Sequence, residues 1–235
     1  MTELRTNDAP AGATSAPSAA SAEVESAGVE STGSPPPNPA VLGLLAFSVG
    51  GTVLGISLLG YVSAAAQGGS VMPIVYAATG LGVLITTIWA AALGQTFVAA
   101  VFGAFTGFWL SYAAFVLGLA HNWYAIPHTQ VSHSVAQFLI AWAIVIFMLD
   151  IVSVYLPSSF TMILSSALVA VILLIIANLD GSTVLPKVAG GFILLFSVIG
   201  FYDFLATGIE SVGGRPLSLG PPLRMLLSRE RGARR

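Results

Sequence analysis

The segment from Asn38 to Gly214 most restricts how this chain can fold, because it is long, apolar and almost free of charge. Its only acidic or basic residues are Asp150, Asp180, Lys187, Asp203 and Glu210. Over the whole chain 8% of residues are charged, whereas soluble domains have roughly 25%. A segment with so few polar side chains has no face to present to water, so it is predicted to lie in a lipid bilayer.

Six apolar runs in this segment are each long enough to cross a bilayer, which takes about 20 residues. The predicted spans are Ala40–Val62, Val71–Leu93, Phe97–Leu119, Val135–Leu156, Phe160–Leu179 and Pro186–Gly208. The sequence therefore predicts an all-α membrane protein, with a six-transmembrane-helix bundle formed by residues 38–210.

The two tails differ in composition and charge. Residues 1–37 consist mainly of small residues, proline and a few acids, and are predicted to be a disordered cytoplasmic N-terminal extension. Residues 211–235 form an Arg-rich tail, expected to be cytoplasmic and to contact anionic lipid headgroups. Six crossings put both termini on one side, and only Lys187 is basic on the other. The positive-inside rule therefore predicts that both termini are cytoplasmic in a multi-pass protein of the plasma membrane.

Composition also excludes several functions. The chain has no cysteine, which excludes a disulfide framework, thiolate metal sites and cysteine nucleophiles. Its net charge of −2 argues against nucleic acid as a partner. Nothing in the sequence resembles a nucleotide-binding loop, a catalytic triad or a paired-carboxylate site, so we expect neither an enzyme nor a bound cofactor.

Ordered motifs in the apolar segment resemble one known family. They are Asn38-Pro39-Ala40-Val41-Leu42-Gly43-Leu44, Gly94-Gln95-Thr96-Phe97, Phe108-Trp109-Leu110-Ser111, Ala136-Gln137-Phe138-Leu139 and Leu217-Ser218-Leu219-Gly220. The first differs only at Val41 from the signature Asn-Pro-Ala-Pro-Leu-Gly-Leu of the acetate uptake transporter family, which contains bacterial succinate–acetate permeases. The chain is identified as a divergent member of this family by resemblance.

The resemblance implies a six-helix bundle, usually assembled as a cyclic hexamer with one substrate path per subunit. It implies transport of small carboxylates, chiefly acetate-like monocarboxylates and sometimes the dicarboxylate succinate, either coupled to protons or channel-like. The positions of the family's hydrophobic constriction correspond here to Phe47, Phe105 and Ala167. Phe47 is the family's residue, whereas Phe105 replaces Tyr and Ala167 replaces Leu. On the sixth helix, the resemblance adds Gly200 and Tyr202 to the path.

The second predicted helix departs from the family. Val83 and Ala90 occupy positions where the family commonly carries a Gln and a Glu, so the membrane part of this helix has no amide or ionisable side chain. This departure leaves an alternative function open, a non-transporting membrane scaffold or sensor that kept the bundle and lost the chemistry for its cargo.

Two kinds of polar residue are candidates for the transport chemistry. Asp150 and Asp203 are the acids well inside predicted helices, and are candidate sites for the co-transported proton. Asn38, Gln95 and Thr96 lie at or beside cytoplasmic helix N-termini, where free backbone N–H groups favour contact with a carboxylate.

Three histidines, His121, His128 and His133, fall in the predicted outer loop after the third span. Their spacing does not match a compact zinc motif, so no metal site is expected. We interpret them as exposed interfacial side chains, with a pH-sensitive outer loop as the alternative.

Overall fold

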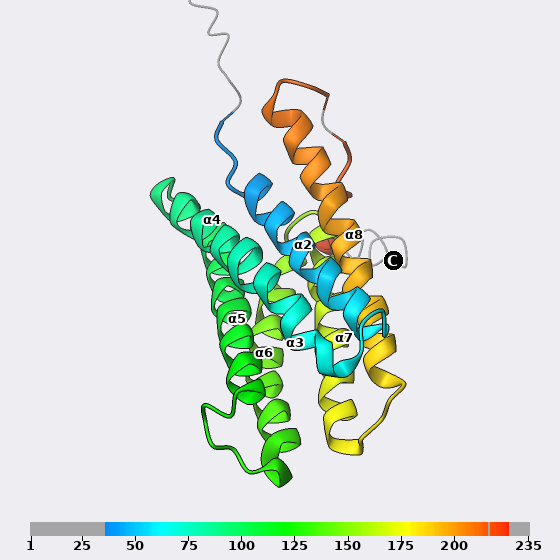
Figure 1. Cartoon of the computed structure of the whole chain (residues 1–235). Coiled ribbons are helices and arrows are strands. Elements are labelled where there is room, and N and C mark those ends of the chain that lie inside the picture. Colours follow the sequence, from blue (N-terminus) through cyan, green and yellow to red (C-terminus); the bar gives the residue numbers. More distant parts are fainter. Residues whose placement is uncertain (1–35, 216, 226–235) are drawn as a thin grey trace, which may run out of the picture. The chain divides into compact units, whose positions relative to one another are not determined.

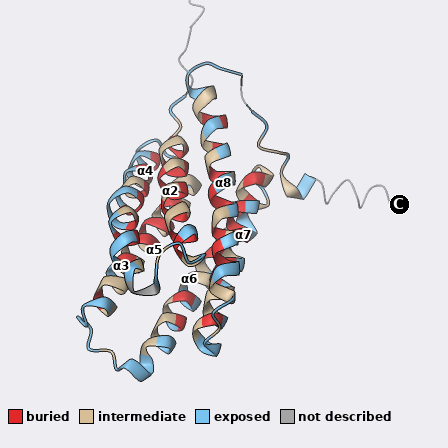
Figure 2. Cartoon of the chain, turned by 45° about the vertical axis from the view of Figure 1, so that its right-hand side comes forward, coloured by how far each residue is buried: buried red, intermediate tan, exposed pale blue. Residues whose placement is uncertain are grey.

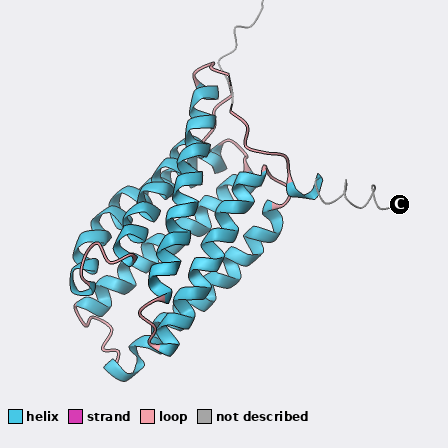
Figure 3. Ribbon diagram, turned by 90° about the vertical axis from the view of Figure 1, so that its right-hand side faces the viewer, coloured by secondary structure: helices cyan, strands magenta, loops and turns pink. Residues whose placement is uncertain are grey.

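A computed structural model of the chain describes residues 36–215 and 217–225, apart from the side chains of residues 64 and 65. The predictions for nearly all of the N-terminal extension, residues 1–35, and for the arginines at positions 229, 231, 234 and 235 fall outside the described residues. The described part is helical, and Figure 3 draws its segments as helices joined by loops.

The prediction of six spans is confirmed. The candidate membrane spans are Ala40–Leu58 (α2), Ala66–Ala92 (in α3, η1 and α4), Thr96–Ala120 (α5), His128–Ser153 (η2 and α6), Ser158–Asp180 (α7) and Leu185–Ser211 (α8). Each is apolar enough to cross a bilayer by length and composition. An all-helical bundle satisfies its own backbone hydrogen bonds within each span, which a bilayer core requires.

The second span is not a uniform α-helix. It consists of α3 (Ala64–Pro73), the π-helical segment η1 (Ile74–Gly80) and α4 (Leu81–Ala92). Pro73 directly precedes the π-helical segment. Because proline has no N–H and its ring clashes with the carbonyl four residues before it, the α-helical pattern is interrupted there.

Two helices begin earlier than the sequence predicted. Residues 67–70, which fall between the first two predicted spans, belong to α3, and α6 begins at Val131 rather than Val135. Val71 and Met72, which follow Gly68, Gly69 and Ser70, are buried. Their packing outweighs the low helix propensity of glycine, which costs only about 1 kcal/mol per residue. His133 therefore lies in the first turn of α6, and His128 begins the short helix η2 (His128–Gln130), while His121 follows the end of α5.

The helices pack as a ring around the middle of the bundle (Figure 1). Helix α2 packs on α8, α8 on α7, and α7 on α6, while α5 packs on α4 and α4 on α2. The backbones of α5 and α6 lie farther apart, and aromatic side chains fill the space between them, with the ring centroids of Phe115 and Phe138 5.2 Å apart. We call the end with residues 36–40, 92–96, 153–158 and 208–215 the terminal end, and the end with residues 58–66, 120–131 and 180–185 the loop end.

Glycines allow the close packing of α2 on α8. A Cβ atom added to Gly190 would lie 2.9 Å from the carbonyl oxygen of Gly55, and one added to Gly55 would lie 2.8 Å from Cγ of Leu194. Side chains at these positions would force the two helices apart. Small residues in this role are typical of helix pairs in membranes, where association depends on close backbone approach.

Burial follows the same arrangement. Buried residues face the middle of the bundle, whereas many exposed positions on the outside are large and apolar (Figure 2). On α6 these include Ile144, Phe147, Met148 and Ile151. Such an exposed apolar surface is expected where the surroundings are lipid or another subunit.

Candidate functional site

The bundle encloses a central cavity of about 260 Å³ between α2, α5, α6, α7 and α8. Its lining is mainly aromatic and aliphatic, with Gln67, Tyr112 and Asn178 among its few polar side chains. Four residues also line a second space of about 340 Å³ at the loop end, which we call the vestibule: Leu54, Gln67, Tyr112 and Val116. The central cavity therefore adjoins the vestibule and reaches toward the loop end.

An apolar cavity of about 130 Å³ lies on the other side of Phe47 and Phe105, toward the terminal end. Its lining includes Ala40, Phe97 and Phe160, which stand near helix starts at that end, and it has no polar side chain. The central cavity and the apolar cavity have only two lining residues in common, Phe47 and Phe105. These two side chains form the partition between the cavities.

The partition is tightly built. The ring centroids of Phe47 and Phe105 are 4.7 Å apart with planes at 66°, an edge-to-face contact. Phe196 lies 4.9 Å and Trp109 lies 6.0 Å from the Phe47 ring. Ala167 is buried and lines the central cavity. All three positions that the resemblance assigned to a constriction therefore line the same cavity, and two of them, Phe47 and Phe105, are in contact.

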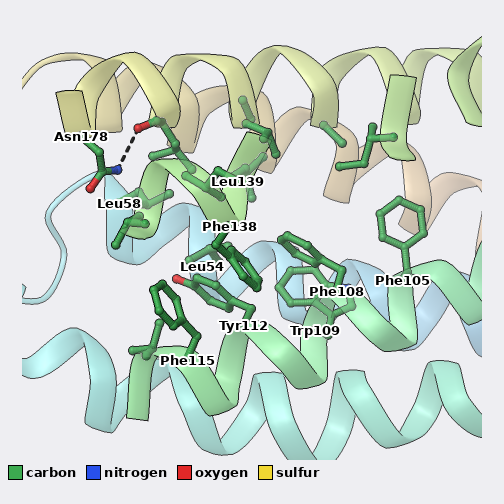
Figure 4. A pocket seen from close by; sticks show the side chains of 18 of the residues that line it. Leu54, Leu58, Phe105, Phe108, Trp109, Tyr112, Phe115, Phe138, Leu139 and Asn178 are labelled. Atoms are coloured by element: carbon green, nitrogen blue, oxygen red, sulfur yellow. Dashed lines mark hydrogen bonds between the residues drawn. The ribbon is translucent and has the colours of Figure 1, made fainter. Parts of the chain in front are cut away.

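Helix α5 carries a row of aromatic side chains along the central cavity. Figure 4 shows Phe105, Trp109, Tyr112 and Phe115 following one another along this helix. Their spacing of three or four residues places them on one side of an α-helix. The indole N–H of Trp109 is buried and has no hydrogen-bond acceptor among the described residues. It is a hydrogen-bond donor next to the partition that sequence reasoning did not single out, although its spacing from Phe105 was visible.

Two other polar side chains of the central cavity donate hydrogen bonds to backbone carbonyl groups of the protein. The Asn178 amide donates to the carbonyl of Leu174 at 2.8 Å (Figure 4). The Gln67 amide donates to the carbonyl of Ser57 at 3.2 Å. Gln67 and Tyr112 line both the central cavity and the vestibule, so they mark the polar entrance at the loop end.

Asn38 and Gln95 meet in a terminal pocket of about 330 Å³ at the terminal end. Both polar groups already have partners, because Asn38 Oδ1 accepts from the Ala40 N–H at 3.1 Å and the Gln95 amide donates to the Pro37 carbonyl at 3.3 Å. Glu210 lines the same pocket, and its carboxylate opposes binding of an anion. Thr96 is exposed and is absent from the lining.

The two positions assigned on the sixth span lie elsewhere. Gly200 is buried against α2, where a Cβ would collide with the Ser48 hydroxyl. Tyr202 is exposed, and its hydroxyl donates to the Ser218 carbonyl at 2.7 Å. Neither residue lines the central cavity or the apolar cavity.

The two candidate proton sites have different surroundings. Asp150 is half-buried and accepts hydrogen bonds from the Ser165 hydroxyl at 2.9 and 3.1 Å and from the Ser153 hydroxyl at 3.2 Å. Asp203 is completely buried, and its two carboxylate oxygens have no hydrogen bond of ordinary geometry within the described residues. The structure therefore distinguishes two aspartates that look alike in the sequence.

Val83 and Ala90 are both completely buried on α4. Their apolar side chains fill helix contacts without leaving a polar group unsatisfied. His121 lines the vestibule and stacks on Trp123, with ring centroids 5.4 Å apart. Among residues 36–215 and 217–225, no group of three or more His, Cys, Asp or Glu side chains is placed to hold a metal ion.

Comparison with known proteins supplies the family. Residues 29–212 match the GPR1/FUN34/yaaH family. The chain belongs to this family. Membership confirms the resemblance to the acetate uptake transporter family drawn from the ordered motifs.

Two curated proteins are similar to this chain. Meiotically up-regulated gene 86 protein of Schizosaccharomyces pombe is 31% identical over 137 residues, which cover 54% of this chain and 44% of that protein. Ammonia transport outward protein 2 of Saccharomyces cerevisiae is 28% identical over 179 residues, which cover 72% of this chain and 60% of that protein. The chain thus matches about half the length of these relatives.

A solved structure has the same fold. The bacterial acetate channel SatP superimposes with a TM-score of 0.69 at 20% sequence identity, covering 78% of this chain and 99% of that chain. The similarity confirms the arrangement of the helices for this member of the GPR1/FUN34/yaaH family.

Proposed function

We propose that the protein transports small carboxylates, chiefly monocarboxylates of the acetate type, with the dicarboxylate succinate as a second cargo, through the central cavity, the partition and the apolar cavity. The observation that carries this proposal is the position of Phe47 and Phe105, the two side chains shared by the linings of both cavities. Two cavities in line, separated by two rings, form a path that small movements of these rings can open.

The lining favours an uncharged cargo. Burying an isolated charge among apolar side chains is costly, and the apolar cavity offers no polar side chain to compensate. A monocarboxylic acid in its neutral form avoids this cost and still presents a carbonyl oxygen as an acceptor. Trp109 lines the central cavity, and its buried indole N–H, which has no acceptor among the described residues, can donate to such an oxygen once the side chain turns toward the cavity.

Orientation, assembly and location complete the proposal. Both termini are assigned to the cytoplasm of a plasma-membrane protein, because in the sequence the basic residues other than Lys187 all lie before the first span or after the last one, whereas Lys187 begins α8 near the loop end. The protein is assigned to a homo-oligomer, a hexamer by family resemblance. The large apolar side chains on the outside of the bundle support contact with lipid or other subunits.

Ammonia is a second candidate cargo. The name of the Saccharomyces cerevisiae relative refers to outward ammonia transport. The apolar cavity favours this cargo as well, because neutral ammonia also avoids the cost of desolvating a charge. A scaffold that transports nothing is the third reading, supported by the apolar Val83 and Ala90.

Flux through the purified full-length protein in liposomes tests these functions. Labelled acetate and labelled methylamine, an ammonia analogue, are supplied to protein-containing and protein-free vesicles. Saturable, protein-dependent acetate flux that propionate inhibits supports the proposal. Methylamine flux without acetate flux favours ammonia as the cargo. If neither solute nor any other small acid is transported, the result favours a non-transporting scaffold.

A further inference from the structure

One face of α8 runs from the central cavity to the terminal pocket. Ile193 and Phe196 line the central cavity, whereas Thr207 and Glu210 line the terminal pocket. Asp203 lies between these pairs on the same face, because residues 193, 196, 203, 207 and 210 follow the helical repeat. All except Glu210 are buried, so this face is turned into the bundle.

Asp203 is the one ionisable residue in the buried part of that face, and it is completely buried. The Ser159 hydroxyl at the start of α7 faces its side chain. Neither this hydroxyl nor the carboxylate oxygens have a hydrogen bond of ordinary geometry within the described residues. A carboxylate buried in this way lacks the partners that normally stabilise its charge.

The elements packed against Asp203 provide no opposite charge. Helix α2 has no ionisable residue, and the only one on α7 is Asp180, at the loop end. Among the described residues, Lys187 lies at the loop end, and Arg215 and Glu210 are exposed. Arg224 lies over the Tyr155 ring, 5.1 Å from its centroid, and Asp150 binds Ser165. Tyr202, next to Asp203 on α8, faces outward and binds the Ser218 carbonyl.

An ionised aspartate near the centre of a membrane helix costs about 2.5–3.5 kcal/mol on the insertion scale. A bound proton removes that charge without needing an ion pair. We propose that Asp203 is the proton-binding site of this protein and that it exchanges protons with the solution through the terminal pocket. Thr207, which lines that pocket, is four residues away, about 6 Å along the helix axis.

Glu210 extends the same route to the solvent, because it is exposed and lines the terminal pocket. Asp150 is not part of the site. Its carboxylate accepts hydrogen bonds from Ser165 and Ser153, which stabilise it without a proton. Asp150→Asn is therefore a matched control, since it makes the same chemical change on α6, another helix of the bundle.

Infrared difference spectroscopy tests the site without relying on transport. Spectra of the full-length protein in liposomes are recorded while the pH is stepped between about 9 and 6, a range in which exposed carboxylates, whose ordinary pKa is about 4, stay ionised. The C=O stretch of a protonated carboxylic acid is followed. We expect a titrating band in the parent and in Asp150→Asn, and its loss in Asp203→Asn. A band that persists in Asp203→Asn, or no band in the parent, overturns the proposal. If Asp203→Asn does not fold, Asp203→Glu is measured instead. We expect this variant to shift the C=O band, and an unshifted band overturns the proposal.

The role of this site in transport rests on the proposed function and has its own measurement. Asp203→Asn is expected to lose the part of the pH dependence of the protein-dependent acetate uptake rate that a proton-binding group on the protein produces, whereas Asp150→Asn keeps the pH dependence of the parent. A pH dependence in Asp203→Asn equal to that of the parent overturns the role of Asp203 in transport. No acetate flux in the parent refutes the proposed function, while a titrating band lost in Asp203→Asn still supports the proton site.

Discussion

The rings of Phe47 and Phe105 lie 4.7 Å apart, edge to face, and they alone line both the central cavity and the apolar cavity. The two residues come from different helices, α2 and α5, so a small change in the distance between these helices changes the opening. Phe196 of α8 packs against Phe47, with ring centroids 4.9 Å apart. The partition therefore depends on three helices of the ring.

Shortening a ring of the partition should raise the flux. Phe105→Leu replaces a flat ring with a smaller side chain and is expected to increase the initial rate of acetate uptake several-fold, because the steric barrier falls. Phe147→Leu, the same change at an exposed position of α6, is the control and should leave the rate unchanged. Equal rates for Phe105→Leu and the parent would show that this ring does not limit passage.

The size of residue 167 should set selectivity among acids. Ala167 lines the central cavity where relatives carry Leu, so the wall has about three heavy atoms fewer and three- and four-carbon acids meet a lower steric barrier. We expect Ala167→Leu to shift preference toward acetate, measured by competition of propionate, butyrate and lactate against labelled acetate. Val169→Leu, at an exposed position of α7, is the control. An unchanged order of competition in Ala167→Leu would remove residue 167 from the path.

The buried indole N–H of Trp109 should contribute to substrate affinity. Trp109→Phe keeps an aromatic ring and removes the donor, so we expect the apparent KM for acetate to rise about threefold to tenfold, the range of one hydrogen bond. Trp142→Phe serves as control, because Trp142 does not line the central cavity. If both variants keep the KM of the parent, Trp109 does not bind the cargo.

The close packing of α2 on α8 should require a glycine at position 190 but not at the adjacent position 191. A Cβ at Gly190 would lie 2.9 Å from the Gly55 carbonyl oxygen, whereas a Cβ at Gly191 meets nothing within 4 Å. Gly190→Ala is expected to be less stable than Gly191→Ala by about 1–3 kcal/mol, the usual cost of overpacking. Thermal unfolding in detergent gives the comparison, and equal Tm values would contradict the observed helix contact.

Much of the architecture could be predicted from the sequence, because six apolar runs of bilayer length permit few alternatives. The resemblance also supplied Phe47 and Phe105, which the structure brings into contact. Helix ends were less predictable, since residues 67–70 have the composition of a loop and yet extend α3.

The side of each helix that faces the path was the least predictable feature. In a bilayer both the lipid-facing and the inward-facing sides are apolar, so hydrophobic periodicity does not show which way a residue points. Tyr202 faces outward although the neighbouring Asp203 is completely buried. Asp150 and Asp203 could be told apart only once Ser165 was seen to bind Asp150 from another helix.

The most direct test of the partition uses the absence of cysteine from the chain. Leu164 and Ala167 lie three residues apart on α7, and Leu164 lines the apolar cavity whereas Ala167 lines the central cavity. Single variants Leu164→Cys and Ala167→Cys are reconstituted and treated with a membrane-impermeant thiol reagent from each side, and modification and acetate flux are measured. We expect Ala167→Cys to react from the loop end, Leu164→Cys to react from the terminal end, and either modification to block flux. Reaction of both cysteines from the same side, or unchanged flux after full modification, would contradict a path divided by Phe47 and Phe105.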